Sequence, residues 1–294
     1  MRDAPQRDTR VGIGRTIDPL HRVLLHRPTE ALTNADAAAW GYPRGRDLER
    51  IDEEFRAFCD LLRRHGVELH IDEATVGVDA VYACDPLLPT PWGPVVTTMG
   101  KGLRGAEPAA AAAHLRRLGV APLATLGAGH VEGGDVLWLA PELVLVGVGD
   151  RSDPAGVDAF EALLAPRGVR VRRVELPWRD GPSVCLHLRS LINVLDVDLA
   201  IIDRPWLPTT LVGELQARGL TLLDADPAEI ATQGNNILVL RPRVVAMTAG
   251  NPRTETTLRA AGVEVHAFDG QVLCVEGTGG PTCLCFDLWR AAAT

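Results

Sequence analysis

The stretch Leu61-Leu62-Arg63-Arg64-His65-Gly66-Val67 is the first copy of a pattern that occurs five times in the chain. In each copy an apolar-periodic segment ends at a glycine, and a short strand-like segment follows. The later glycines are Gly119, Gly168, Gly219 and Gly262, so the copies lie about 50 residues apart. Glycine is favoured directly after a helix because it adopts the left-handed backbone conformation at little cost. The pattern therefore predicts five helices, each ending at one of these glycines and followed by a strand.

Two further strands precede each predicted helix, as in Ile237-Leu238-Val239-Leu240 and Val244-Val245-Ala246-Met247. The unit thus reads strand, strand, helix, strand. Five such units predict an α/β fold that closes into a five-fold pseudo-symmetric propeller around a central site. We expect a single catalytic domain over residues 1–294, with repeats at approximately 20–75, 76–127, 128–180, 181–229 and 230–294. The alternative is a doubly wound α/β sheet, but no glycine-rich phosphate-binding loop opens any predicted helix.

The composition is that of a globular protein with an acidic balance. Of the 294 residues, 46% are hydrophobic and 23% are charged, and the net charge is -8. This balance argues against a nucleic-acid partner, whose phosphates attract basic surfaces. We see neither the apolar region of a signal peptide nor a run of about 18 apolar residues, so we expect no membrane partner. None of the six cysteines forms a CxxC pair, which indicates free thiols in a reducing cytoplasm, the expected location.

Polar side chains occur at equivalent places, where the first strand of a unit is predicted to begin. They are Asp79 and Asp85 in the second unit, Glu132 in the third, His187 in the fourth, and Asn235 and Asn236 in the fifth. Polar groups buried beside strands carry a desolvation cost, so their recurrence predicts one shared central opening. The segment Gly279-Gly280-Pro281-Thr282-Cys283 can bring a thiol to the same opening.

A thiol, an imidazole and carboxylates around one opening indicate nucleophilic catalysis. A Cys thiolate is a strong nucleophile, and a His can transfer protons. A carboxylate can orient the His and stabilise its charged form. Each residue also has a structural alternative: Cys283 can be a buried core cysteine, His187 a core histidine, and Glu132 or Asp85 a turn acid.

Three stretches of the chain resemble the guanidino-group-modifying (pentein) superfamily. They are Val131-Glu132-Gly133-Gly134-Asp135-Val136, Leu186-His187-Leu188-Arg189-Ser190 and Gly279-Gly280-Pro281-Thr282-Cys283. Members include arginine deiminases, amidinotransferases and dimethylarginine dimethylaminohydrolases. The resemblance covers nearly the whole chain, beginning at Val23-Leu24-Leu25-His26-Arg27-Pro28. It implies five ββαβ units around a pseudo-five-fold axis, in agreement with the repeat.

The resemblance implies a role for seven residues. The catalytic set is Cys283 as the nucleophile, His187 as the general acid and base, and Glu132 as the acidic partner of that His. The substrate-binding set is Asp85 for the guanidinium, Asp79 near the amino-acid end of the substrate, and Arg104 and Arg151 for its carboxylate.

Two residues depart from the patterns of related families. Arginine deiminases usually carry an Asp two positions after the catalytic His, where this chain has Arg189, and dimethylargininases have a basic residue there. Dimethylargininases commonly have Glu where this chain has Cys84. Arg189 therefore favours the dimethylargininase subfamily, while Cys84 leaves the guanidine substrate open.

The implied reaction is hydrolysis at the guanidine carbon of an Nω-substituted (methylated) arginine, or a related guanidino compound. Citrulline and an amine would form through a covalent thiouronium intermediate on Cys283. The expected partner is a small cationic guanidino substrate, with no metal and no cofactor, and a homodimer is a possible assembly. The loop 29–45 is a predicted lid. The alternatives are an amidinotransferase, an arginine deiminase and, outside the enzymes, a ribosome-binding pentein.

Overall fold

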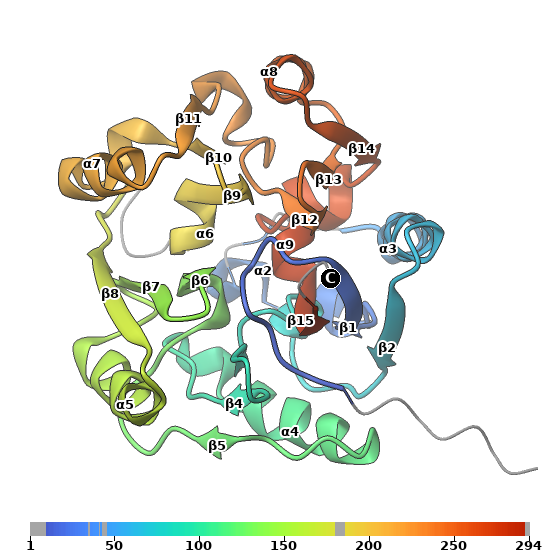
Figure 1. The fold of residues 1–294 in the computed structure, drawn as a ribbon. Coiled ribbons are helices and arrows are strands. Elements are labelled where there is room, and N and C mark those ends of the chain that lie inside the picture. Colours follow the sequence, from blue (N-terminus) through green and yellow to red (C-terminus); the bar gives the residue numbers. More distant parts are fainter. Residues whose placement is uncertain (1–9, 35, 41, 43–45, 180–185, 292–294) are drawn as a thin grey trace, which may run out of the picture.

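Five small sheets surround a central axis in the computed structural model (Figure 1). The structure describes residues 10–34, 36–40, 42, 46–179 and 186–291. The order of strands is the same in every sheet: the middle strand pairs antiparallel with one neighbour and parallel with the other. This regularity confirms the five-fold pseudo-symmetric α/β propeller predicted from the repeat.

Each sheet consists of an antiparallel partner, a middle strand and a parallel partner, in that order. The five sets are β15 (Cys285–Arg290), β1 (Leu20–His26) and β2 (Glu68–Asp72); β3 (Leu87–Leu88), β4 (Val95–Val96) and β5 (Ala124–Thr125); β6 (Val136–Ala140), β7 (Leu143–Val148) and β8 (Arg170–Glu175); β9 (Ile192–Asp196), β10 (Leu199–Ile202) and β11 (Thr221–Asp224); and β12 (Leu238–Arg241), β13 (Val244–Thr248) and β14 (Glu264–Phe268).

One long helix connects the middle strand of each sheet to its parallel partner. These helices are α3 (Leu48–Arg64), α4 (Glu107–Arg117), α5 (Pro154–Leu164), α7 (Thr209–Ala217) and α8 (Pro252–Ala260), and they lie on the outside of the ring (Figure 1). The five glycines that follow them have φ angles between 76° and 88°. The predicted helix ends are thus confirmed, since only glycine adopts this conformation at little cost.

Shorter helices and turns fill the connections. They are α1 (Ala31–Asn34), α2 (Ala37–Trp40), α6 (Leu188–Leu191) and α9 (Pro281–Leu284), the 3-10 turns η1 (Asp79–Val81), η2 (Gly102–Arg104), η3 (Gly133–Asp135), η4 (Ala165–Arg167), η5 (Arg204–Trp206) and η6 (Pro227–Glu229), and the π-helical turn η7 (Gln271–Val275).

Helix α3 shows why the outer helices form and pack. Its N-cap Asp47 accepts hydrogen bonds from the backbone N–H groups of Glu49 and Arg50, which have no partner inside the helix. The fully buried Phe58 and Leu62 lie four residues apart on the face that packs against the sheet. Replacing Phe58 by Ala would cost about 3–5 kcal/mol, because the cavity adds to the lost apolar burial.

The two ends of the described chain meet in one sheet, which requires a correction to the predicted unit boundaries. The repeat places strand β15 in the fifth unit, 230–294, but this strand pairs antiparallel with β1 of the first unit. In Figure 1 the two strands lie side by side. This pairing closes the ring, because β1 would otherwise present an unpaired edge.

None of the helices in the described part of the chain combines the length and the apolar composition needed to cross a bilayer.

Candidate active site

Each strand that begins a unit is preceded by a polar or nucleophilic residue. Asp85 precedes β3, Glu132 precedes β6, His187 precedes β9, Asn236 precedes β12 and Cys283 precedes β15. All five side chains come from the same end of equivalent strands, so the propeller gathers them around its axis. The central opening predicted from the repeat is therefore present.

The opening contains a pocket with a volume of about 120 Å³. Six of the seven predicted site residues line it, and the seventh, Glu132, lies behind His187. The six are Asp79, Asp85, Arg104, Arg151, His187 and Cys283. The other lining residues had been given no individual role from the sequence; they are Trp40, Tyr42, Tyr82, Lys101, Ser190, Thr278 and Gly279.

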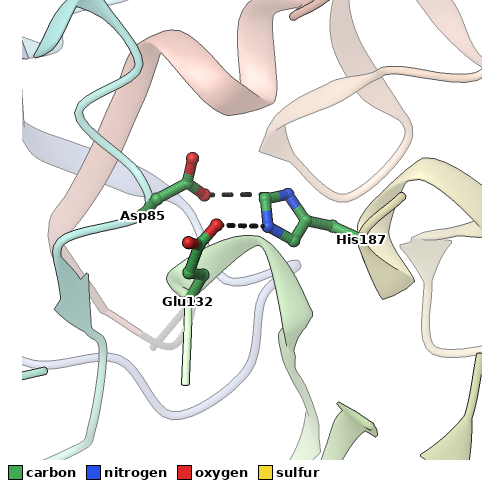
Figure 2. A group of neighbouring side chains, drawn as sticks. All are labelled: Asp85, Glu132 and His187. Carbon is green, nitrogen blue, oxygen red and sulfur yellow. Dashed lines mark hydrogen bonds and ion pairs between the residues drawn. The ribbon is translucent and has the colours of Figure 1, made fainter. Parts of the chain in front are cut away.

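The imidazole of His187 is held between two carboxylates (Figure 2). Its Nε2 lies 2.9 Å from Oε2 of Glu132, and its Nδ1 lies 3.8 Å from Oδ1 of Asp85. Gly134 permits this arrangement, because a Cβ at that position would overlap the His187 ring at Nδ1 and Cγ. The glycine of the Glu-Gly-Gly-Asp motif thus makes room for the catalytic ring.

Glu132 is fully buried and ionised. Burial opposes its ionisation, but the hydrogen bond to His187 and the charges of His187, Arg104 and Arg151 outweigh burial and lower the pKa of Glu132 to about 2. Its Oε1 accepts a hydrogen bond of 3.0 Å from the backbone N–H of Gly100. The carboxylate is thereby fixed as a negatively charged partner for the imidazole.

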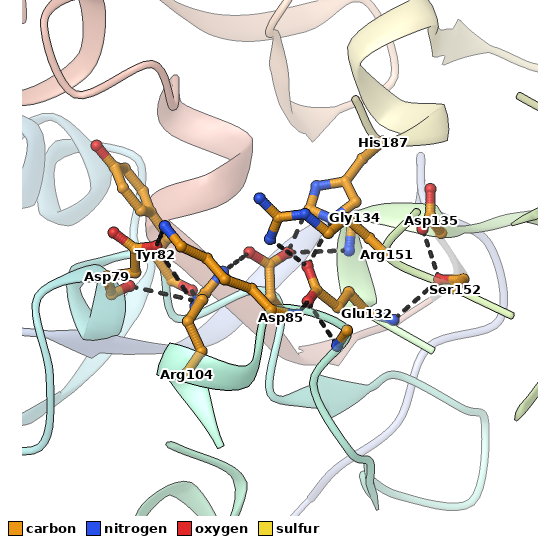
Figure 3. A network of polar contacts seen from close by, with 12 residues as sticks. Asp79, Tyr82, Asp85, Arg104, Glu132, Gly134, Asp135, Arg151, Ser152 and His187 are labelled. Atoms are coloured by element: carbon orange, nitrogen blue, oxygen red, sulfur yellow. Dashed lines mark hydrogen bonds and ion pairs between the residues drawn. The ribbon is translucent and has the colours of Figure 1, made fainter. Parts of the chain in front are cut away.

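Asp135 holds the backbone that carries His187, and Figure 3 shows its contact with Ser152. Its Oδ1 accepts a 2.8 Å hydrogen bond from the N–H of Leu188, and its Oδ2 accepts one of 2.5 Å from the Ser152 hydroxyl. Ser152 Oγ in turn accepts a 3.1 Å bond from the N–H of Glu132. The second acid of the motif is therefore structural, and it ties the His187 turn to the segment that carries Glu132.

Cys283 differs from the other described cysteines in exposure. Its thiol is half-buried and lines the pocket, whereas Cys59, Cys84, Cys274 and Cys285 are buried. Burial raises the pKa of Cys59 to about 12 and the pKa values of the other three buried thiols as well. Buried thiols with raised pKa values are poor nucleophiles. Among the described cysteines, the geometry singles out Cys283.

The Asn236 amide contacts the Cys283 sulfur. Its Nδ2 lies 3.2 Å from Sγ, while its Oδ1 accepts a 3.0 Å hydrogen bond from the N–H of Thr282. The second bond fixes which end of the amide faces the thiol. Gly280 allows the close approach, since a Cβ there would lie 2.5 Å from Cγ of Asn236. Asn236 can therefore donate to a thiolate at Cys283.

Arg104 lies in the pocket wall, but its guanidinium is already occupied (Figure 3). Nη1 lies 2.6 Å from Oδ2 of Asp85, and Nε and Nη2 bind the Glu107 carboxylate at 2.7–3.0 Å. Nη2 also donates to two backbone carbonyls, and the residue is 3% exposed. The predicted contact of Arg104 with a substrate carboxylate would break these bonds. In this structure Arg104 instead orients Asp85.

Lys101 is a pocket cation that no motif of the sequence indicates. Its Nζ lies 2.8 Å from Oδ2 of Asp79 and 4.6 Å from the centre of the Trp40 ring. The hydroxyl of Tyr42 donates to the other oxygen of Asp79. Lys101 is the sole lysine of the sequence, which was its one signal, although codon bias accounts for the scarcity of lysine equally well.

The predicted lid, residues 29–45, contributes Trp40 and Tyr42 to the pocket. Gly41, Pro43 and Gly45 lie outside the described residues, as does Cys185. Arg151 lines the pocket as predicted, with Nη1 at 3.4 Å from Oε2 of Glu132.

The two residues that depart from the related families contact each other. Nη1 of Arg189 lies 3.7 Å from Sγ of Cys84, and both side chains are buried. Neither residue lines the pocket. Arg189 therefore does not line the space where a guanidinium would bind.

Asp85, Glu132 and His187 also form the sole group in the described chain whose ligand atoms lie close enough to share a metal ion, within 4.8 Å of one another. Their charges are already compensated without one. Arg104 binds Asp85, and Arg151 and His187 bind Glu132. The expectation of no metal stays a prediction.

Comparison with known proteins agrees with this geometry. The family model for arginine deiminase matches residues 111–219 and 214–290. The chain belongs to the arginine deiminase family, within the guanidino-group-modifying (pentein) superfamily. Relatives include arginine deiminases of Mycobacterium marinum, 33% identical over 183 residues, and Rhodococcus jostii, 30% identical over 184 residues. Each alignment covers 52% of this chain and 45% of the relative, so the chain matches about half the length of these family members.

Solved structures support the fold. An amidinotransferase of Microseira wollei from the saxitoxin biosynthetic pathway superposes with a TM-score of 0.78 over 96% of this chain and 98% of its own, at 14% identity. The dimethylarginine dimethylaminohydrolase of Pseudomonas aeruginosa gives a TM-score of 0.74 over 91% and 99%, at 19% identity. Members of the superfamily with different names thus share this propeller.

Proposed function

We propose that this protein hydrolyses the guanidine carbon of arginine or an arginine-like substrate to a ureido group, through a covalent intermediate on Cys283. One observation carries the proposal: a half-buried thiol, an imidazole paired with an ionised glutamate, and a carboxylate all surround one pocket. Membership of the arginine deiminase family supports the same class of reaction.

The walls of the pocket suit a substrate that carries both signs of charge. Asp85 would accept hydrogen bonds from the guanidinium, with its orientation set by Arg104. Lys101 and Arg151 would bind the carboxylate of the substrate, and Asp79 its amino group. A bound guanidinium beside Cys283 would favour the thiolate by direct attraction.

In the first step the Cys283 thiolate attacks the guanidine carbon and forms a C–S bond. The carbon–nitrogen bond to the leaving amine breaks as His187 gives that nitrogen a proton. Glu132 stabilises the charged form of His187 before the transfer, and Asn236 holds the sulfur in place.

In the second step a water molecule enters where the amine has left. His187 removes a proton from the water, whose oxygen attacks the thiouronium carbon. The C–S bond then breaks, which releases the ureido product and returns the thiolate. The roles of Cys283, His187 and Glu132 in these steps are those predicted from the sequence, and that of Asn236 is added from its contact with Sγ.

Two finer assignments stay predictions. Arg189 predicts an Nω-methylated arginine as the substrate, whereas the sequence relatives are named arginine deiminases. Amidino transfer, in which an amine replaces water in the second step, uses the same residues. The fold of an amidinotransferase matches this chain, but at 14% identity it does not distinguish the two reactions.

The test is incubation of the protein with arginine, Nω-methylated arginines and other guanidines, followed by detection of ureido products. Glycine and ornithine are added in parallel as amidino acceptors, and products are identified by mass. We expect a ureido product and a Cys283 adduct when the reaction is quenched early. Absence of ureido product with every guanidine would contradict hydrolysis. Transfer of the amidino group to glycine or ornithine would show that the protein is an amidinotransferase.

A further inference from the structure

A second and larger cavity adjoins the active-site pocket. Its volume is about 440 Å³, compared with about 120 Å³ for the pocket described above. The two spaces share Ser190 and Thr278 in their walls. The larger cavity also includes Asn236, whose amide touches the Cys283 sulfur.

The cavity also reaches the residue that would protonate the leaving amine. Leu186 directly precedes His187 and Ser190 follows it by three residues, and both line the cavity. His187 itself lines the smaller pocket. The N–H of Ser190 donates to the carbonyl of His187 at 3.0 Å, so this turn is compact. A nitrogen that leaves beside His187 therefore lies at the junction of the two spaces.

The lining of the cavity is apolar on one side and uncharged polar on the other. Pro227, Ile230 and Ala231 supply apolar surface. Gln233 and Asn235 supply amide groups. The Gln233 amide can donate a hydrogen bond to a ligand in the cavity or accept one from it.

One charged residue, Arg179, lines the described part of the cavity. It is compensated by Asp203, whose Oδ2 lies 2.6 Å from Nη1 of Arg179, and its guanidinium stacks 5.2 Å from the centre of the Trp206 ring. A charged ligand would therefore lose hydration without gaining a free counter-charge. The chemistry of the lining fits an uncharged group with apolar and hydrogen-bonding parts.

We propose that this cavity holds the substituent on the leaving nitrogen of an Nω-substituted guanidine, and that this substituent is uncharged and larger than a methyl group. The inference rests on the proposed hydrolysis. The substituted nitrogen takes the proton from His187, its bond to the guanidine carbon breaks, and the amine departs with its substituent through the cavity. The ureido product stays in the smaller pocket.

The test compares arginine, Nω-methylarginine and Nω-propylarginine as substrates of the full chain and of Ala231→Trp. Ala231 is exposed and lines the cavity, so an indole there would fill it with little effect on folding. Ala228→Trp is the matched control, because Ala228 is exposed on the neighbouring turn η6 and does not line the cavity. We expect the unmodified chain to accept the propyl compound. We expect Ala231→Trp to lower kcat/KM for that compound about 10-fold or more, with arginine and the Ala228→Trp control unchanged.

Binding to Cys283→Ser, measured by calorimetry, separates this inference from the proposed reaction. In the Cys283→Ser, Ala231→Trp double variant we expect the affinity for propylarginine to be lost and the affinity for arginine to be retained. This result supports the cavity assignment even if no substrate is turned over. The assignment is overturned if the propyl compound neither binds nor reacts, or if Ala231→Trp weakens arginine and propylarginine equally. Neither result would contradict the proposed hydrolysis of arginine itself.

Discussion

The two sides of the active-site pocket are built in different ways. The side that would perform the chemistry takes Glu132, His187, Asn236 and Cys283 from four different positions around the ring, each just before a strand. The side that would bind the substrate takes Asp79, Asp85, Lys101 and Arg104 from one connected stretch of the second unit, where they pair with one another. The first arrangement follows from symmetry, and the second follows from a local network of charges.

This difference explains what each side can tolerate. On the chemical side, His187, Asn236 and Cys283 are positioned by the turns before their strands and by a few contacts, so a single substitution there should remove one function. Glu132 is the exception, because it also has charged partners. A residue on the binding side is held by charged partners, so a substitution there leaves the charge of its partner without a counter-charge. Substitutions on both sides of the pocket test this contrast. The predictions below are ordered from a near-complete loss of activity to no effect.

Cys283→Ser should lower ureido formation by about 10³-fold or more, because a hydroxyl replaces the attacking thiolate. The measurement is kcat/KM with the best guanidine substrate, together with mass detection of the covalent adduct. Cys59→Ser on the outer helix α3 is the matched control and should retain activity. If Cys283→Ser keeps activity and still forms an adduct, the nucleophile lies elsewhere.

Lys101→Met should raise KM for arginine about 10-fold and leave agmatine, which lacks the carboxylate, nearly unchanged. The physical reason is that Lys101 would bind the substrate carboxylate, because Arg104 is occupied by Asp85 and Glu107. The control is Arg116→Met, which removes an exposed cation from helix α4. An equal loss with both substrates would show that Lys101 only maintains the network around Asp79.

Asn236→Ala should slow alkylation of Cys283 by iodoacetamide at neutral pH about 10-fold or more and shift its pH profile to higher pH, because the amide N–H that faces Sγ would stabilise the thiolate. Hydrogen bonds to charged groups contribute about 1.5–3 kcal/mol. Cys283→Ser serves as the blank for alkylation at other cysteines. An unchanged profile would mean that Asn236 positions the backbone through Thr282 and does not influence the thiol.

Glu132→Gln should change how stability depends on pH. The folded pKa of Glu132, about 2, lies below the ordinary 4.5, so its ionised form stabilises the fold above pH 4.5, and this contribution is lost as the pH falls toward 2. The free-energy difference between the original chain and Glu132→Gln should thus be largest near pH 6, on the order of 2 kcal/mol, and should narrow below pH 4.5. Denaturant unfolding at several pH values measures it. The exposed Glu142→Gln is the control, and a constant difference would contradict the assigned ion pair.

Removal of metal ions should have no effect. The charges of Asp85 and Glu132 are compensated by Arg104, Arg151 and His187, so the group does not need a bound cation. Activity measured after dialysis against a chelator tests this. A loss of activity that Zn²⁺ or Mg²⁺ restores would show that the Asp85–Glu132–His187 group binds metal.

The sequence by itself determined the repeat, the ends of the five helices and the placing of Glu132 and His187 at the starts of equivalent strands. These features are local, because the glycine after a helix is required by the backbone conformation of that one position. The symmetry of the fold then places equivalent positions of the five units around the same axis. A resemblance in three short stretches was then enough to indicate the chemistry.

The tertiary structure alone decided the rest. Strand β15 joins the first unit, Arg104 is occupied by Asp85 and Glu107, Arg189 turns to Cys84, and Lys101 enters the pocket. Each of these depends on which partner a strand edge or a charged side chain meets across the fold, and a linear pattern does not specify that partner. The second cavity also follows from packing between units, and its lining residues lie from position 179 to position 278.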